Sequence, residues 1–182
     1  MSISETALLV VDVQESFRHR SYWRDSELPL FVEHLRSLIA GAQSLKIPVI
    51  QIFHVEDSGP FSLESGYVVP LRDLSFTPDA VFQKRSHSAL IGSGVDVWLT
   101  RHSIRRLIVC GIRTEQCCET TTRHASDLGY QVDYVTDATL TFPMTDRYGR
   151  EWTPEQIKSR TELVLEARFA RITTVREALA MA

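Results

Sequence analysis

The feature that most constrains the fold is an almost wholly apolar run at residues 7–11, Ala-Leu-Leu-Val-Val, which stops at the carboxylate of Asp12. A strand with one face in water alternates polar and apolar side chains, whereas an unbroken apolar run is typical of a strand that is covered on both faces. A carboxylate is costly at the end of such a strand unless it has a partner or a chemical role. The sequence therefore predicts a buried central strand with a functional or loop-capping residue at its end.

Strand-like and helix-like runs alternate along the rest of the chain. Strands are predicted over residues 49–55, 80–83, 107–111, 131–135 and 172–175. Helices are predicted over residues 28–46, 94–102, 115–128 and 154–167, with a terminal turn or helix over residues 175–180. This alternation predicts an α/β fold, a three-layer α/β/α sandwich with a mostly parallel sheet between helices. A long loop rich in glycine and proline leads to the strand at residues 80–83, and such loops are often functional.

Composition limits the number of domains and the kinds of partner. With 182 residues, of which 43% are hydrophobic, the chain can bury one good core, so we expect a single domain over residues 1–182. A formal net charge of -3 offers no basic surface for nucleic acid or for an anionic membrane. Residues 7–11 are too few for the apolar core of a signal peptide, and no run is long enough to span a bilayer. Three cysteines, two of them adjacent, do not form a disulfide framework, so we expect a cytoplasmic protein.

A thiol follows the predicted strand at residues 107–111. Thr114 is a natural N-cap, Glu115 suits the positive end of the next helix, and Cys117 falls in its first turn. Unpaired amides and the helix dipole favour a thiolate there, so we expect the pKa of Cys117 to lie below the ordinary ~8.5. Cys117 is a candidate nucleophile, although it and Cys118 are equally compatible with a role as small core side chains.

A nucleophilic thiol needs a base and a positive group beside the developing charge. Asp12 ends the first strand, and Lys84 ends the strand at residues 80–83. Ligands of open parallel sheets bind beyond the carboxyl ends of the strands, where Asp12, Lys84 and Cys117 are all expected. Taken singly, Asp12 is also consistent with a loop cap and Lys84 with a solvated strand end.

Several spaced motifs in this chain match one family. They are residues 9–14 (Leu-Val-Val-Asp-Val-Gln), residues 82–84 followed by 88–90, residues 111–117 (Gly-Ile-Arg-Thr-Glu-Gln-Cys), and residues 129–130 and 137–138. Over nearly its whole length the sequence resembles the isochorismatase-like cysteine hydrolases, which include nicotinamidases, N-carbamoyl amide hydrolases and isochorismatase. The resemblance implies a Rossmann-like six-stranded sheet of order 3-2-1-4-5-6, with Asp12 and Cys117 at the crevice.

The resemblance also implies roles for individual residues. Cys117 would be the nucleophile, Asp12 the base that takes its proton, and Lys84 the cation that holds both. A cis peptide bond between Ile112 and Arg113 would precede an oxyanion hole made by the amides of Arg113 and Cys117. Family members often form dimers or tetramers, so a homo-oligomer is expected, whereas no cofactor is expected.

These groups suit acyl transfer through a thioester. Nicotinamidases of the family carry an Asp-x-His metal set after the second strand, but the aspartate is missing from residues 51–57 here, Gln-Ile-Phe-His-Val-Glu-Asp. A metal site built from His54, Glu56 and Asp57 is the less favoured alternative to a solvated loop, and we expect no metal. Isochorismatase, which acts on a vinyl ether, lacks the nucleophilic cysteine. Cys117 therefore favours a C–N bond in a small amide, ureide or N-carbamoyl substrate.

Side chains that follow the strand ends are candidates for the substrate pocket. Phe17 and Trp23 follow the first strand and could enclose a flat substrate, or could pack the loop onto the sheet. His87 could orient a substrate carbonyl, or could be solvated.

The sequence is also compatible with a protein of another class. The adjacent cysteines would suit a non-catalytic redox-responsive protein. A nucleotide-binding module is disfavoured, because no glycine-rich phosphate loop follows a strand.

Overall fold

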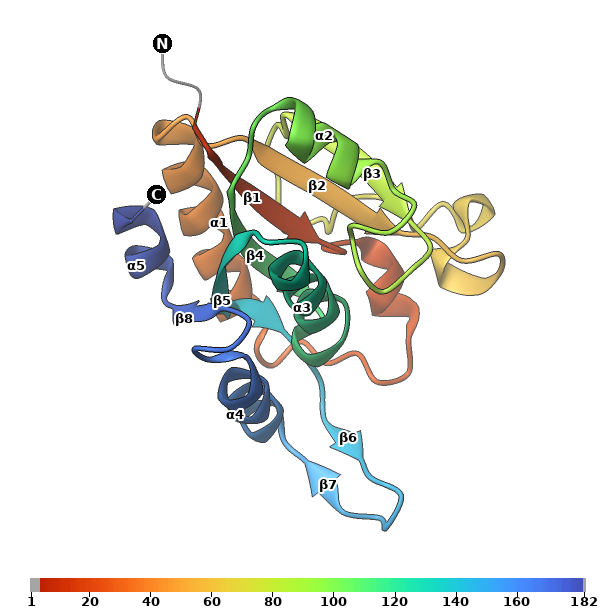
Figure 1. The fold of residues 1–182 in the computed structure, drawn as a ribbon. Helices are drawn as coiled ribbons and strands as arrows, with labels where there is room; N and C mark the ends of the chain where they lie inside the picture. Colours follow the sequence, from red (N-terminus) through yellow and green to blue (C-terminus); the bar gives the residue numbers. More distant parts are fainter. Residues whose placement is uncertain (1–3, 182) are drawn as a thin grey trace.

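The computed structural model describes residues 4–181, which form one parallel sheet between two layers of helices (Figure 1). The sheet contains β1 (Thr6–Val11), β2 (Val49–His54), β3 (Ala80–Lys84), β4 (Arg106–Ile112), β5 (Gln131–Leu140) and β8 (Arg171–Thr173). Their order is β3-β2-β1-β4-β5-β8, and every neighbouring pair is parallel. The predicted sheet order is confirmed, and β8 is the sixth strand of that order.

The apolar run that opens the chain lies at the centre of this sheet. Residues 7–11 are fully buried, and their side chains alternate between two cores. Leu8 and Val10 pack toward α1 (Leu28–Ser44) and α5 (Val175–Ala180), while Leu9 and Val11 pack toward α2 (Val95–Arg101) and α3 (Glu119–Asp127). An unbroken apolar run is thus required because both faces of β1 are covered.

One further helix and three short 3-10 turns lie outside the elements named so far. Helix α4 (Pro154–Leu165) begins with a capping box at Thr153, whose side chain accepts a hydrogen bond from the amide of Gln156. The long loop before β3 contains two short 3-10 turns, Gly59–Phe61 and Leu63–Ser65, and another, Glu15–His19, follows β1. Within the described residues, no helix combines the length and the apolar character needed to cross a membrane.

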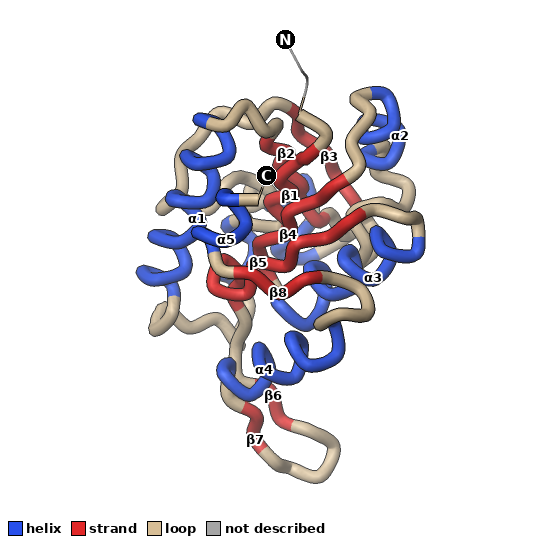
Figure 2. Tube along the Cα trace, turned by 60° about the vertical axis from the view of Figure 1, so that its left-hand side comes forward, coloured by secondary structure: helices blue, strands red, loops and turns tan. Residues whose placement is uncertain are grey.

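Outside the turn that carries Cys117, two parts of the chain differ clearly from the sequence expectation. Strand β5 continues to Leu140, beyond the predicted end at residue 135, and its pairing with β4 shifts register between Val109 and Gly111. The chain then forms a small antiparallel hairpin, β6 (Met144–Thr145) and β7 (Glu151–Trp152), that was not predicted. The hairpin projects from the body of the molecule next to α4 (Figure 2). Its strands of two residues are too short to give a detectable alternation.

Candidate active site

The carboxyl ends of β1, β3 and β4 bring the three predicted catalytic side chains together. Asp12 directly follows β1, Lys84 is the last residue of β3, and Cys117 lies in the turn after β4. Asp12 has a positive φ of 55°, a conformation that aspartate tolerates better than most residues. Its amide donates to the carbonyl of Ile52, 2.8 Å away. The backbone of β2 therefore fixes the point at which Asp12 leaves the sheet.

The ammonium of Lys84 connects the three residues. Its Nζ lies 2.8 Å from Asp12 Oδ2 and 3.3 Å from Cys117 Sγ. Lys84 is 1% exposed, Asp12 is fully buried and Cys117 is 7% exposed. Because β3 and β1 flank β2, the long side chain of Lys84 crosses the end of β2 to reach Asp12. The sequence alone left this approach open, since residues two strands apart in a sheet are separated by roughly 10 Å.

Burial and pairing together set the protonation states. Burial raises the pKa of Asp12 above its ordinary value, and the charge of Lys84 opposes that rise. Burial alone would lower the pKa of Lys84, but Asp12 and Cys117 hold it above its ordinary value. Burial and the carboxylate of Asp12 raise the pKa of Cys117, with Lys84 acting in the opposite direction. The expectation of a lowered pKa for Cys117 is therefore wrong, because it considered the helix terminus and omitted burial and Asp12.

The turn that carries Cys117 differs from the predicted helix start. Residues Thr114–Cys118 form a π-helical turn, in which the amide of Cys118 donates to the carbonyl of Arg113, 3.3 Å away, and α3 begins only at Glu119. Arg113 is the N-cap, and the predicted cap Thr114 donates its hydroxyl to Thr139 Oγ1 at 2.7 Å. Thr114 is thus a buried link to β5, and its prediction as N-cap is wrong.

The residue between β4 and this turn is Arg113, one of the two predicted oxyanion residues. The Ile112–Arg113 peptide bond is cis. The Arg113 side chain is buried, pairs with Glu115 Oε1 at 3.0 Å, and lies over the ring of Tyr22, 4.7 Å from its centroid. Glu115 also accepts a hydrogen bond from Thr141 at 2.6 Å. The charge of the Arg113 side chain is therefore balanced within the protein.

The three predicted pocket residues occupy different positions. His87 is exposed, and its Nδ1 lies 3.9 Å from Cys117 Sγ. Trp23 is partly buried and packs on Phe142, with ring centroids 5.2 Å apart. Phe17 is 5% exposed in the core, with its ring edge against Phe61. The structure thus brings His87 to the thiol, while Phe17 and Trp23 pack their loop onto the body.

His54 also lies at the site, in contact with Lys84. The sequence suggested His54 only as a possible metal ligand and did not predict this contact. His54 ends β2, and its Nδ1 lies 3.0 Å from Lys84 Nζ. The contact could have been predicted from the positions of His54 and Lys84 at the ends of adjacent parallel strands. That prediction requires the knowledge that β2 and β3 pair in this register. Burial, followed by the charges of Lys84, His87 and Arg20, lowers the pKa of His54 to about 4.

The less favoured metal set of His54, Glu56 and Asp57 is not assembled. Asp57 is exposed and pairs with Arg85. A different set, the carboxylate of Asp12, the imidazole of His54 and the thiol of Cys117, has its ligand atoms within 4.8 Å of one another. The ammonium of Lys84 contacts all three residues. A protein cation thus already neutralises the groups that could hold a metal ion.

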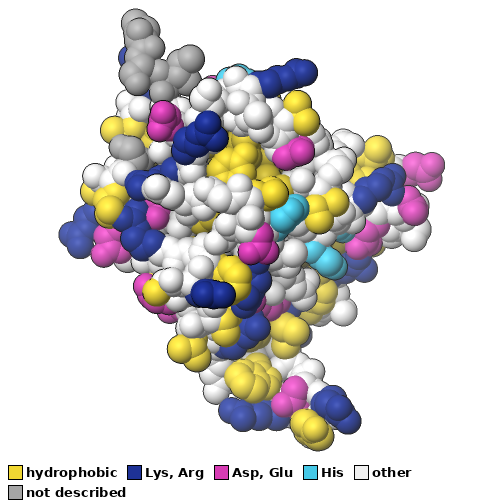
Figure 3. Space-filling view, viewed as in Figure 1, with side chains coloured by type: hydrophobic (Ala, Val, Ile, Leu, Met, Phe, Trp, Pro, Cys, Tyr) yellow, Lys and Arg dark blue, Asp and Glu magenta, His cyan; other side chains and the backbone are white. Residues whose placement is uncertain are grey.

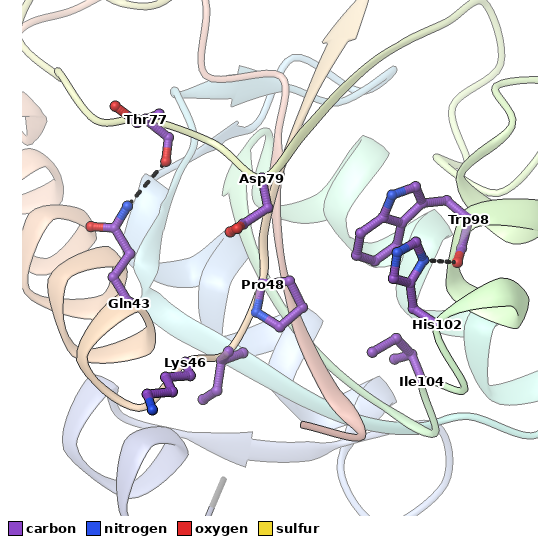
Figure 4. Close-up of a pocket in the computed structure, with 9 residues that line it drawn as sticks. Gln43, Lys46, Pro48, Thr77, Asp79, Trp98, His102 and Ile104 are labelled. Carbon is purple, nitrogen blue, oxygen red and sulfur yellow. Dashed lines mark hydrogen bonds between the residues drawn. The ribbon is translucent and has the colours of Figure 1, made fainter. Parts of the chain in front are cut away.

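Cavities lie on both sides of the candidate site and at the opposite end of the sheet. A cavity of about 280 Å³ is lined by Lys84 and Ser86, and one of about 460 Å³ lies between Gln116 and the β6–β7 hairpin. A third, about 630 Å³, is bordered by Pro48, Asp79 and Ile104, which precede β2, β3 and β4 (Figure 4). It therefore opens at the amino ends of the strands, away from Cys117.

Comparison with known proteins gives a consistent assignment. The sequence model of the Isochorismatase domain matches residues 6–176. An uncharacterized isochorismatase family protein, YrdC of Bacillus subtilis, is 26% identical, with 92% of this chain and 91% of that protein covered. The nicotinamidase of Escherichia coli is 30% identical, with 72% of this chain and 81% of that protein covered.

Solved structures share the fold. A cysteine hydrolase from Pseudomonas syringae superimposes with a TM-score of 0.87 at 20% identity, covering 99% of this chain and 93% of that one. The N-carbamoylsarcosine amidase of Thermoplasma acidophilum gives a TM-score of 0.73 at 19% identity, covering 93% and 96%. At these identities the similarity establishes the fold alone.

Proposed function

Because the chain belongs to the isochorismatase family of hydrolases, we propose that it is a cysteine hydrolase that cleaves the C–N bond of a small amide, ureide or N-carbamoyl compound through a thioester. The observation that carries this proposal is the buried contact of Lys84 with both Asp12 and Cys117. The nicotinamidase relative supports an amide-type substrate. We further propose that residues 1–182 act as one domain. Assembly into a homo-oligomer remains a prediction.

The resting site is proposed to hold Cys117 as a thiol beside an ionised Asp12. The raised pKa of Cys117 disfavours a free thiolate, and the raised pKa of Asp12 makes this carboxylate a better base. When a planar carbonyl carbon approaches, the thiol proton passes to Asp12 and the sulfur attacks. Lys84 stays positive throughout, so it stabilises the thiolate during attack and the carboxylate when the proton leaves again.

The proposed oxyanion hole consists of the backbone amides of Arg113 and Cys117. The oxygen of the tetrahedral intermediate moves toward these donors, each worth roughly 3 kcal/mol in comparable sites. Asp12 then gives its proton to the leaving nitrogen, and ammonia or an amine departs. Water attacks the thioester with Asp12 again acting as base, and collapse of the second intermediate releases the acid and restores the thiol.

Among the predicted substrate-binding residues, His87 has the position that best supports the role. Its exposed ring beside Cys117 Sγ places a polar group where a carbonyl substituent would lie. A role of Phe17 and Trp23 in substrate binding remains a prediction. It would act only through the loop that these two residues anchor. The alternative of a redox-responsive protein has less support, because Cys118, the neighbour of Cys117, is fully buried.

The test is ammonia release from a panel of carboxamides, ureides and N-carbamoyl compounds. We expect turnover by the unmodified protein and by Cys118→Ser, and none by Cys117→Ser. The two substitutions exchange the same atom in adjacent residues, so each is a control for the other. Equal loss in both variants, or release by Cys117→Ser, would contradict a nucleophilic role for Cys117.

A further inference from the structure

The ammonium of Lys84 has more acceptors around it than hydrogens to give. A lysine ammonium has three N–H donors. Four acceptors surround Nζ, namely Asp12 Oδ2 at 2.8 Å, His54 Nδ1 at 3.0 Å, the carbonyl of Ser86 at 3.1 Å and Cys117 Sγ at 3.3 Å. Asp12 and Cys117 belong to the proposed reaction, so His54 and Ser86 are left to determine where the ammonium points.

The second nitrogen of His54 shows which tautomer can accept from Lys84. Nε2 lies 3.7 Å from Glu56 Oε1, and Glu56 is held in turn by Arg20 at 2.9 Å. A carboxylate on this side favours the proton on Nε2, which leaves the lone pair of Nδ1 free to accept from Nζ. The neighbouring charges agree with a neutral ring, because Lys84, Arg20 and the parallel ring of His87 surround it.

The backbone of His54 is fixed to the segment that carries Asp12. Gln14 is fully buried, and its side chain accepts from the amide of His54 at 2.7 Å and donates to the carbonyl of His54 at 3.1 Å. Gln14 lies two residues after Asp12, so one amide side chain sets the spacing between the carboxylate and the imidazole. The His54 side chain is 12% exposed, which restricts its movement.

We propose that His54 is a positioning residue whose neutral imidazole directs the Lys84 ammonium toward Asp12 and Cys117. The importance of this positioning for catalysis rests on the proposed function. The positioning itself acts on the thiol of Cys117 and is measurable without a substrate, since an ammonium held against the sulfur favours the thiolate.

The test compares His54→Asn with His54→Leu by the rate at which iodoacetamide alkylates Cys117 at neutral pH, with the modified residue identified by peptide mass. Asn can place an amide oxygen near the position of Nδ1, whereas Leu has no acceptor, and both variants remove the imidazole ring. We expect His54→Leu to slow alkylation about tenfold or more, the usual effect of losing a hydrogen bond to a charged group. His54→Asn is expected to stay within about threefold of the unmodified protein.

Two results would overturn the proposal: alkylation of His54→Leu at the unmodified rate or faster, which is expected if His54 only competes with Cys117 for the hydrogens of Nζ, or equal slowing in both variants. If His54→Leu does not fold, His54→Gln replaces it, because its longer side chain moves the amide away from the Nδ1 position; equal rates for Gln and Asn then reject the proposal. A panel without turnover would remove the proposed function, while the alkylation comparison would still decide the role of His54.

Discussion

Burial and two neighbouring charges together set the protonation state of the Cys117 thiol. Cys117 lies between a carboxylate that raises its pKa and an ammonium that lowers it, in a place where burial strengthens both effects. The thiol is therefore expected to be protected from adventitious chemistry until a substrate draws its proton to Asp12. This differs from a thiolate stabilised by a helix terminus alone.

Replacing Asp12 by asparagine separates thiolate formation from turnover. Asp12→Asn removes the charge that raises the pKa of Cys117 and leaves Lys84 to lower it, so the thiolate forms at lower pH. We expect the rate of iodoacetamide alkylation to reach its plateau at lower pH than in the unmodified protein, while turnover falls by about 100-fold or more because the proposed base is lost. A variant that retains turnover, or an unchanged alkylation profile, would refute the role of Asp12.

Lys84 is expected to exclude metal ions from the site. Lys84→Ala removes the ammonium and leaves an oxygen, a nitrogen and a sulfur ligand, from Asp12, His54 and Cys117, within 4.8 Å of one another. Zn²⁺ prefers such a set. We expect Lys84→Ala to bind Zn²⁺ at least about tenfold more tightly than the unmodified protein in competition with a chromogenic chelator. Lys84→Ala/Cys117→Ser is the control, and equal affinity in all three proteins would contradict this expectation.

The ends of strands and the turns after them place these charges. β1 and β4 run side by side, and Gly111 in β4 pairs with Val11, the residue before Asp12. Gly111 has a φ of 128°, and a Cβ at this position would overlap the backbone carbonyl of Val11. The close approach of the two strands therefore depends on a glycine, just before the segment that leads to Cys117.

Gly111→Ala is expected to destabilise the protein by about 4 kcal/mol or more, since both the backbone conformation and the overlap with a fixed carbonyl must be relieved. Gly149→Ala is the matched control, because Gly149 also has a positive φ, of 83°, but nothing lies within 4 Å of the position of its Cβ. For this control we expect a cost of about 1 kcal/mol. Chemical denaturation measures both, and equal costs would contradict the close packing of β1 against β4.

Helix starts show how a local pattern succeeds or fails. Thr153 caps α4 in a complete capping box, and its replacement by alanine should cost about 1 kcal/mol. Thr114 is also a threonine before a helical run, but Cys117 rather than Glu or Gln follows three residues later, and the Thr114 hydroxyl bonds to Thr139 on β5. Substituting alanine for each and measuring unfolding in denaturant, with circular dichroism of helix content, tests the distinction. Loss of helical signal with Thr114→Ala alone would contradict it.

The layered architecture could be predicted because its causes are local. An apolar run such as residues 7–11 indicates a strand that is buried on both faces. The alternation of strands with amphipathic helices indicates the three layers. The short hairpin β6–β7 has no such sequence pattern. Apolar and basic side chains gather at its tip (Figure 3), where Tyr148 is 82% exposed.

The proximity of the three side chains was predictable from the sequence, whereas their electrostatics were less so. Asp12, Lys84 and Cys117 could be identified because each ends or follows a strand at the same edge of the sheet. The raised pKa of Cys117 and the contact between His54 and Lys84 depend on burial and on the pairing of β2 with β3. Neither is a property of a short sequence window, so both required the assembled fold.

The central claim, an acyl group carried on Cys117, is tested most directly by hydroxylamine competition. Two substrates that share an acyl group and differ in the leaving amine are hydrolysed in the presence of hydroxylamine, and the ratio of hydroxamate to acid is measured. A shared thioester predicts the same ratio for both substrates, because the leaving amine has departed before partition. Ratios that differ between the substrates, or acid without hydroxamate, would contradict the thioester pathway.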